Sequence, residues 1–501
     1  MSAVYDIVLR GGRVMDPETG TDRVADVAIR GAAVVAIGSG LAAGTVELDA
    51  RGKIVAPGFV DIHAHGQTLA ADRMQAFDGV TTALELEVGA LPVAEWYETQ
   101  GARPRALNYG TSAAWLFARQ KVLSGIVPSG AQPSMKAMGQ GAEDRRWSTD
   151  AASDAQVAEI TALVAGALDE GGIGIGIPNG YAAGTGIREL TRICELAAAR
   201  GSVTYTHIAN ISNIDPKSSL ESYLQIIGLA GATGAHMHVC HLNSTSLTDV
   251  ARSVEVLRKA QQQGLPITVE AYPYGTGSTV VSWDFLTHPE FGARTGAEYD
   301  QIQLVRSGAR FTDAEDIRRA AAEAPADLIM WHFLDTAQNP EHERLLDLSV
   351  TYPGGAIASD ALPWTMPDGG FYDGDAWPLP EEATSHPRSS GTFTRFLSRY
   401  VRDRGVMDLM EGLAKCTLIP AQVVEGAAPQ MRRKGRLQVG CDADIAVFDL
   451  EALADRATFE EMNRPSEGVV HLLVGGVPVI RDGALDPGAA PGQAVRGAGA
   501  W

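Results

Sequence analysis

The run Val60-Asp61-Ile62-His63-Ala64-His65-Gly66 decides the fold. It follows the apolar segment 52–60, so we expect both histidines at the end of a buried β-strand. Residues two apart on a strand face the same side, and His63 and His65 can therefore reach one point. Two imidazole nitrogens at one point begin a divalent metal site. The alternative is a pair of polar residues on a solvated strand face.

Composition narrows the class of protein. The chain has 501 residues, 45% of them hydrophobic and 20% charged, which is typical of a globular protein with more than one domain. A net charge of −20 argues against nucleic acid and anionic membranes as partners. Four cysteines without paired spacing indicate no disulfide framework and a reducing compartment. No signal peptide or transmembrane span is recognisable, so we expect a cytoplasmic protein.

Both ends of the chain have the pattern of short β-strands separated by tight turns. Alternating apolar residues at 5–10 and 33–37 are matched by similar runs at 443–448 and 469–474. We therefore predict one small β-sandwich built from residues 1–57 and 430–490. Two unrelated β segments are the alternative. Residues 491–501, rich in Gly, Ala and Pro, are expected to form a loose tail.

The middle of the chain, residues 58–429, alternates short apolar runs with amphipathic helices. This alternation predicts parallel strands in an α/β fold, a (β/α)₈ barrel of the TIM type. Such a barrel needs about 250 residues, and we assign the surplus to an insertion near 282–324. The predicted strands after the first are 80–87, 172–177, 202–207, 236–241, 266–272, 328–332 and 356–359; the predicted helices are 154–170, 187–200, 247–264, 313–323 and 391–404.

Two acids stand within one otherwise apolar strand. Glu85 and Glu87 share parity in the run 79–88, so both face one side. A buried acid without a partner costs several kcal/mol, and a metal would remove that cost. Glu87, nearer the C-terminal end, is the candidate ligand and could bridge two metals. The alternative is that one or both acids pair with a buried Arg or Lys.

Further strand ends supply the remaining candidate ligands. His207 ends one strand, and the next carries three histidines at 236, 238 and 241. If His241 points into the barrel, parity directs the other two toward the helices. Asp360 follows a late strand, where it could touch a metal and exchange a proton with activated water. A helix N-cap or loop turn is the alternative for Asp360.

The ordered set of His-x-His, strand acid, two strand histidines and late Asp resembles the amidohydrolase superfamily over nearly the whole chain. Residues 55–65 resemble the superfamily's first-strand motif, and residues 434–448 resemble its return into the small β domain. The resemblance implies a metal-dependent hydrolase of amide C–N bonds. Its ligands would be His63, His65, Glu87, His207 and His241, holding one or two Zn²⁺ or other divalent ions. The catalytic acid and base would be Asp360.

Within this superfamily the chain is most similar to the N-acyl-D-amino acid deacylases. The segments 270–279 and 386–393 resemble their Tyr-Pro-Tyr and His-Pro-Arg segments. The resemblance implies that Arg388 and Tyr272 or Tyr274 hold a substrate carboxylate, which suits the two parallel bonds of a guanidinium. A surface ion pair is the alternative for Arg388.

The chain departs from those deacylases at two positions. Their metal-binding Cys corresponds to Val88, so Glu87 would replace the thiolate. Their Lys after the sixth-strand His corresponds to Asn243 in the substrate site, so part of the carboxylate clamp is missing. Residues 171–177 contain no Lys, which argues against branches that use a carboxylated lysine, although 238–241 resembles dihydroorotases.

The sequence thus predicts a metal-dependent deacylase of N-acyl amino acids, with a D enantiomer open. The alternatives are a cyclic amide hydrolase of the hydantoinase or dihydroorotase kind, a deaminase, and a non-catalytic scaffold on the same fold. The scaffold would lack some ligand positions, and none is missing. The expected partner is a small molecule bearing an amide and a carboxylate, without nucleic acid or membrane; homo-oligomerisation is open.

Overall fold

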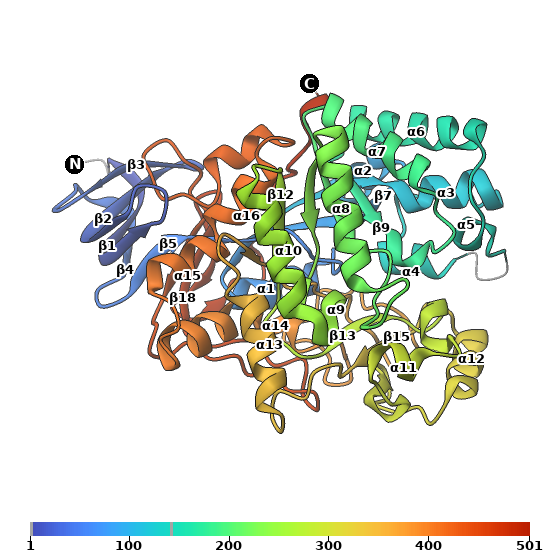
Figure 1. Ribbon diagram of the computed structural model, residues 1–501. Helices are drawn as coiled ribbons and strands as arrows, with labels where there is room; N and C mark the ends of the chain where they lie inside the picture. Colours follow the sequence, from blue (N-terminus) through green and yellow to red (C-terminus); the bar gives the residue numbers. More distant parts are fainter. Residues whose placement is uncertain (1–3, 141–143, 501) are drawn as a thin grey trace.

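The computed structural model describes residues 4–140 and 144–500. Eight parallel strands form a nearly closed barrel in the order β16-β12-β11-β10-β9-β8-β7-β6 (Figure 1). The strands are β6 (Phe59–Asp61), β7 (Val80–Ala90), β8 (Asn108–Ala114), β9 (Ile175–Pro178), β10 (Val203–His207), β11 (His236–Val239), β12 (Ile267–Ala271) and β16 (Ala356–Ile357). The predicted (β/α)₈ barrel is therefore confirmed.

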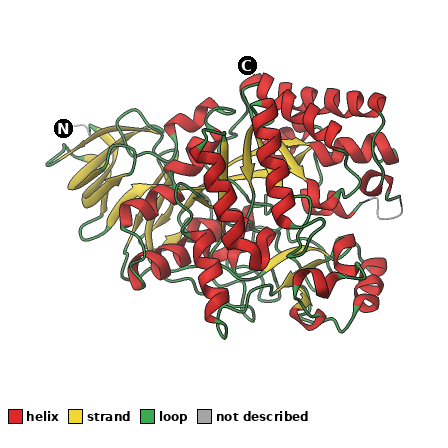
Figure 2. Ribbon diagram, viewed as in Figure 1, coloured by secondary structure: helices red, strands yellow, loops and turns green. Residues whose placement is uncertain are grey.

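Helices cover the outside of the barrel (Figure 2). Their ends follow local sequence signals: α6 begins with a capping box between Ser153 and Gln156, and α8 ends at Gly234 in a left-handed conformation. The helices are α1 (Leu69–Phe77), α2 (Val93–Gly101), α3 (Trp115–Ser124), α4 (Ser134–Gly139), α5 (Arg146–Thr149), α6 (Asp154–Asp169), α7 (Ile187–Ala199), α8 (Ser219–Thr233), α9 (Leu242–Ser246), α10 (Val250–Gln262), α13 (Pro340–Val350), α14 (Arg388–Arg395), a π-helix (Phe396–Asp403), α15 (Leu409–Cys416) and α16 (Leu418–Val424). Within the described ranges, no helix has both the length and the apolar character needed to cross a membrane.

The barrel closes between its first and last strands. Ala64 forms a parallel bridge with Ala361, and the His65 amide donates to the Ala361 carbonyl at 2.7 Å. The buried Asp61 carboxylate adds to this seam by accepting from the Ser359 amide at 3.0 Å and from the Ser359 hydroxyl. Burial raises the pKa of Asp61 to about 6. The seam holds the two strand ends that carry the histidine pair and Asp360 next to each other.

The prediction of the barrel strands is wrong at two places. β8 was missed because its sequence, Asn-Tyr-Gly-Thr-Ser-Ala-Ala, lacks the β-branched apolar run typical of a buried strand. Residues 328–332 were assigned to the barrel, but β15 (Leu328–Trp331) lies in a separate antiparallel sheet with β13 (Gly277–Val280) and β14 (Ile302–Leu304). This sheet and the helices α11 (Phe291–Thr295) and α12 (Ala314–Glu323) form the insertion, coloured yellow-green in Figure 1. A short apolar run does not distinguish a barrel strand from an insertion strand.

Strands from both chain ends pair in one nine-stranded sheet, at the left of Figure 1. β17 runs antiparallel to β5, which joins the C-terminal strands to the N-terminal ones. An apolar core that includes Leu9, Val27 and Ile445 lies within this sheet. The strands are β1 (Tyr5–Asp16), β2 (Thr21–Arg30), β3 (Ala33–Gly38), β4 (Gly44–Asp49), β5 (Ile54–Pro57), β17 (Ile445–Phe448), β18 (Val469–Val474), β19 (Val477–Arg481) and β20 (Ala484–Leu485).

The C-terminal segment is not the loose tail that its composition suggests. Val495 is buried, its amide donates to the Tyr109 carbonyl at 2.7 Å, and its carbonyl accepts from the Tyr97 hydroxyl at 2.6 Å. Gly497 donates to the Gly171 carbonyl at 2.8 Å. Glycine fits there because a Cβ would lie 2.2 Å from the Gly172 carbonyl oxygen. Small residues in this segment therefore serve close backbone contact rather than mobility.

Candidate metal centre and active site

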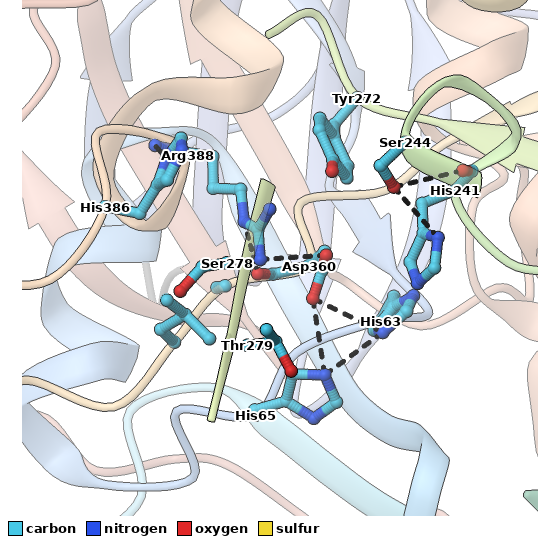
Figure 3. Close-up of polar contacts among 12 residues, drawn as sticks. His63, His65, His241, Ser244, Tyr272, Ser278, Thr279, Asp360, His386 and Arg388 are labelled. Carbon is cyan, nitrogen blue, oxygen red and sulfur yellow. Dashed lines mark hydrogen bonds and ion pairs between the residues drawn. The ribbon is translucent and has the colours of Figure 1, made fainter. Parts of the chain in front are cut away.

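The four predicted histidine ligands converge at the C-terminal end of the barrel. The Nε2 atoms of His63 and His65 lie 3.1 Å apart, and the rings of His63 and His241 are 5.3 Å apart (Figure 3). The His207 and His241 ring centroids are separated by 5.0 Å. All four side chains are nearly inaccessible to solvent. Side chains from the segment after β6, from the last residue of β10 and from the loop after β11 thus meet at one place, as the strand-end argument predicts.

Carboxylates behind the first histidine pair fix which nitrogen faces the cluster. Glu270 accepts from His63 Nδ1 at 2.5 Å, and Glu85 contacts His65 Nδ1 with both oxygens at 2.9 Å. Each Nδ1 therefore carries a proton, and each Nε2 presents a lone pair to the other. Two lone pairs at 3.1 Å call for a cation between them. The donor set therefore fits a divalent metal.

The electrostatics of the cluster agree with this interpretation. Burial opposes a charge on His63, but Glu270, Asp360 and Glu87 raise its pKa well above the ordinary value. These three carboxylates therefore favour a positive charge at the His63 ring. At the other end of the cluster, burial lowers the pKa of His207 to about 4, which leaves that imidazole neutral at pH 7.

Glu87 stands between the two histidine pairs. One carboxylate oxygen lies 3.0 Å from His241 Nε2, and the other lies 3.3 Å from His63 Nε2 and 3.6 Å from His65 Nε2. Potential ligand atoms of Glu87, His63 and His65 form one compact group, and those of Glu87, His207 and His241 form a second. The arrangement provides two adjacent sites that share one carboxylate.

Asp360 adds a second carboxylate beside His63 and His65. Its Oδ1 lies 3.3 Å from His65 Nε2 and 3.5 Å from His63 Nε2, while Oδ2 pairs with Arg388 Nη2 at 2.8 Å (Figure 3). Burial opposes ionisation, but Arg388 and His63 hold the pKa of Asp360 below its usual value. Its backbone φ of 51° lies in the left-handed region, which is strained for a residue with a side chain. One oxygen therefore remains directed toward the histidines.

Arg388 is wholly buried and lies over Tyr272, with its guanidinium carbon 4.7 Å from the ring centroid. It is no surface ion pair: Nε donates to the Asp360 carbonyl at 2.6 Å. Among the described residues, Arg388 Nη1 and the Tyr272 and Tyr274 hydroxyls have no hydrogen-bond partner. Asn243 lies further back and donates to the Tyr272 and Tyr274 carbonyls at 3.1 Å.

The parity argument for the third histidine strand is wrong. β11 ends at Val239, and His241 follows in a left-handed conformation with φ 33°, so strand alternation does not extend to it. His238 consequently shares a face with Glu270 and contacts its Oε2 at 3.0 Å. His236 instead contacts the Thr268 hydroxyl at 2.9 Å.

Glu270 is the residue that sequence reasoning missed. It joins His63 to His238, and no role was assigned to it although it lies within the quoted Tyr-Pro-Tyr segment. The signal was available: Glu270 is an acid in an otherwise apolar strand, as Glu85 and Glu87 are. Glu85 itself faces the outer nitrogen of His65 and accepts from the Ser134 hydroxyl at 2.5 Å, so it supports a candidate ligand.

Comparison with known proteins agrees with the site geometry. The amidohydrolase family model matches residues 46–258 and 245–480. The chain is 30% identical to an N-acyl-D-glutamate deacylase of Alcaligenes xylosoxydans xylosoxydans, over 99% of this chain and 97% of the relative. It is 25% identical to a D-aminoacylase of the same organism, over 97% of this chain and 96% of that protein. The fold matches the crystal structure of N-acyl-D-glutamate deacylase from Bordetella bronchiseptica, complexed with zinc and a phosphonate inhibitor, with a TM-score of 0.75, 23% identity and coverage of 98% and 99%.

Proposed function

This chain belongs to the amidohydrolase family, and we propose that it removes the acyl group from N-acyl amino acids, acting on the D enantiomers. The observation that carries the proposal is the arrangement of two histidine pairs around the shared carboxylate of Glu87, with Asp360 alongside. The deacylase names of its relatives support the reaction, and an N-acyl amino acid supplies both the amide and the carboxylate that the residues call for.

We assign His63, His65 and Glu87 to one metal ion, and His207, His241 and Glu87 to a second. Zinc suits imidazole with carboxylate donors. When bound, the metal polarises the amide carbonyl and activates a water molecule for attack. Glu270 and Glu85 keep the ligand nitrogens of His63 and His65 free of protons. The Glu87 carboxylate is a harder ligand than a thiolate and would suit a divalent ion at either site.

Asp360 is the proton carrier in this proposal. Oδ1 faces the cluster, where it takes a proton from the attacking water and returns it to the leaving nitrogen. Arg388 keeps the carboxylate ionised and holds Oδ2 at 2.8 Å, so the accepting oxygen stays in place. The strained backbone at Asp360 serves the same positioning.

The substrate carboxylate belongs near Tyr272 and Arg388. The Tyr272 hydroxyl and Arg388 Nη1 are buried donors that lack partners among the described residues, which is the state expected of groups awaiting an anion. Tyr272 lines the cavity above the cluster. The Asn243 side-chain amide donates to the backbone carbonyls of Tyr272 and Tyr274, and we propose that this contact positions the segment that carries Tyr272. The four cysteines are free and buried, which suits a reducing cytoplasm, where we place the reaction.

The experiment is metal analysis of the purified protein followed by a substrate panel. In a panel of N-acetyl amino acids of both enantiomers, the D enantiomers should be hydrolysed, while hydantoins and dihydropyrimidines should not. Asp360→Asn, loaded with metal, should lose at least about 100-fold in kcat/KM because its general acid and base is gone. Turnover of cyclic amides alone, or near-normal turnover by metal-loaded Asp360→Asn, would overturn the proposal.

A further inference from the structure

A second cavity lies on the outer face of the insertion sheet, away from the metal cluster, and we call it the outer cavity. Its space of about 790 Å³ lies between the insertion, the loop after β12, and α14. Side chains alternate along β15 and the residues that follow it. Trp331 and Phe333 line the cavity above the cluster, whereas His332 and Leu334 line the outer cavity. Among the described residues, none lines both cavities.

Arg310 lines the outer cavity with one edge of its guanidinium group unused. Its Nη1 donates to the Asp300 carbonyl at 2.5 Å, and the group forms no other hydrogen bond or ion pair within residues 4–140 and 144–500. Acidic residues outnumber Lys and Arg by 61 to 41 in this chain, yet none in the described ranges pairs with Arg310. The Nε–Nη2 edge presents two parallel donors, which match the two oxygens of a carboxylate. Arg310 is exposed, so a solute can reach this edge.

Arg395 of α14 supplies a second guanidinium group to the same cavity. Its Nε donates to the Pro273 carbonyl at 2.9 Å, and its Nη1 pairs with Asp455 at 2.8 Å. The guanidinium carbon lies 4.7 Å from the centroid of the Tyr274 ring. These contacts fix the group in place and leave Nη2 as its remaining donor, so little freedom is lost when it binds a ligand.

The other polar groups of the outer cavity do not cancel this positive charge. Among the described lining residues, Asp335 is the only acid, and its Oδ1 accepts from the amides of Ala337 and Gln338 at 3.2 and 3.0 Å. Burial, with a contribution from Arg310, lowers the pKa of His332 to about 4, so this imidazole is neutral at pH 7. Two guanidinium groups against one carboxylate favour an anion in the cavity.

We propose that the outer cavity binds a small organic acid, with its carboxylate on the Nε–Nη2 edge of Arg310 and Nη2 of Arg395 as a second donor. The apolar part of this ligand would lie against Leu334 and Phe459, which also line the cavity. A bound anion would then connect the insertion to α14. The site is independent of the proposed deacylase reaction, because none of the candidate metal ligands lines it.

The test follows the histidine imidazole resonances of the full-length, zinc-loaded protein by NMR while benzoate is added at pH 7 and constant ionic strength. His332 lines the outer cavity and reports on it, whereas His241 reports on the metal cluster. The His332 resonance is identified by its loss in His332→Gln. We expect a saturable shift of His332 with benzoate and none with benzamide, which is neutral and of similar size. A shift of His241 alone, or equal shifts of His332 with both compounds, would overturn the proposal.

Variants at Arg310 test the contact itself, with circular dichroism to establish that each is folded. Arg310→Gln should raise the Kd for benzoate at least about tenfold, because a hydrogen-bonded charge is lost. Arg310→Lys should also weaken binding, since it keeps the charge but not the paired donors. Arg319→Gln is the matched control: it removes the same charge from α12, where Arg319 pairs with Asp316, and should leave Kd within about twofold. Equal weakening by Arg310→Gln and Arg319→Gln would mean general electrostatic attraction and would refute the site.

Inorganic phosphate separates recognition of a carboxylate from binding of any oxyanion. It should compete with benzoate only weakly, because the apolar surface beside the guanidinium groups gives it no contact. Tighter binding of phosphate than of benzoate at His332 would overturn the assignment to an organic acid.

Discussion

Replacing Glu270 by glutamine should weaken metal binding by about 10- to 100-fold, which is about 1.4–2.8 kcal/mol. Glu270 is 2% exposed and uses one oxygen for His63 Nδ1 at 2.5 Å and the other for His238 Nε2 at 3.0 Å. An amide of the same size presents a single accepting oxygen, so one of the two imidazoles loses its acceptor. A histidine without a carboxylate behind it is a weaker base and is less firmly oriented toward the ion.

The assay is a competition between the stripped protein and a chromophoric zinc chelator at fixed pH. Glu189→Gln is the matched control, because Glu189 is also a buried acid, paired with Arg119 and Trp115 away from the cluster. It should lower the free energy of unfolding and leave zinc affinity within about twofold of wild type. If Glu270→Gln bound zinc as tightly as the wild-type protein, the carboxylate would not tune the ligand, and the reasoning would be refuted.

Three further predictions concern stability. Asp72→Asn should cost about 3–5 kcal/mol in urea unfolding, because Asp72 and Arg105 form a buried pair at 2.8 Å; a loss below about 1 kcal/mol would contradict it. Burial lowers the pKa of Lys415 to about 8 from 10.5. Between these pH values the unfolded chain binds the extra proton, so wild-type stability relative to Lys415→Met should rise with pH, whereas parallel profiles would argue against it. Deleting residues 492–501 should lower the melting temperature by several degrees, since Tyr97 and Tyr109 lose backbone partners, and an unchanged value would show that the segment contributes nothing.

The barrel and the histidine positions could be predicted because each depends on local pattern. His63 and His65 lie just beyond β6, but Ala64 between them still pairs with Ala361, so strand-like alternation continues and the spacing of two gives both side chains a common direction. The same rule failed for His241, because β11 ends two residues before it and the backbone turns left-handed. Periodicity describes a strand only as far as the strand extends, and the last residue of a strand is the least certain feature of a sequence.

Other features depend on contacts between distant segments. Nothing local to Arg388 shows that its guanidinium pairs with Asp360, 28 residues earlier in the chain. Residues 328–332 form a strand as expected, but pairing with β13 and β14 rather than with a barrel neighbour is decided by topology. The composition of residues 491–500 suggested mobility, whereas the small residues allow the backbone to approach Gly171 and Tyr109 closely.

The pairing of first and last segments has a consequence for synthesis on the ribosome. β5 pairs with β17, and the Tyr109 carbonyl of β8 accepts from the amide of Val495. Both partners are translated hundreds of residues later. In the nascent chain, β5 and β8 therefore lack these pairing partners until most of the 501 residues have been translated. Exposed apolar surface and unpaired strand edges promote aggregation, so the late pairing of β17 with β5 limits how early this sheet is protected.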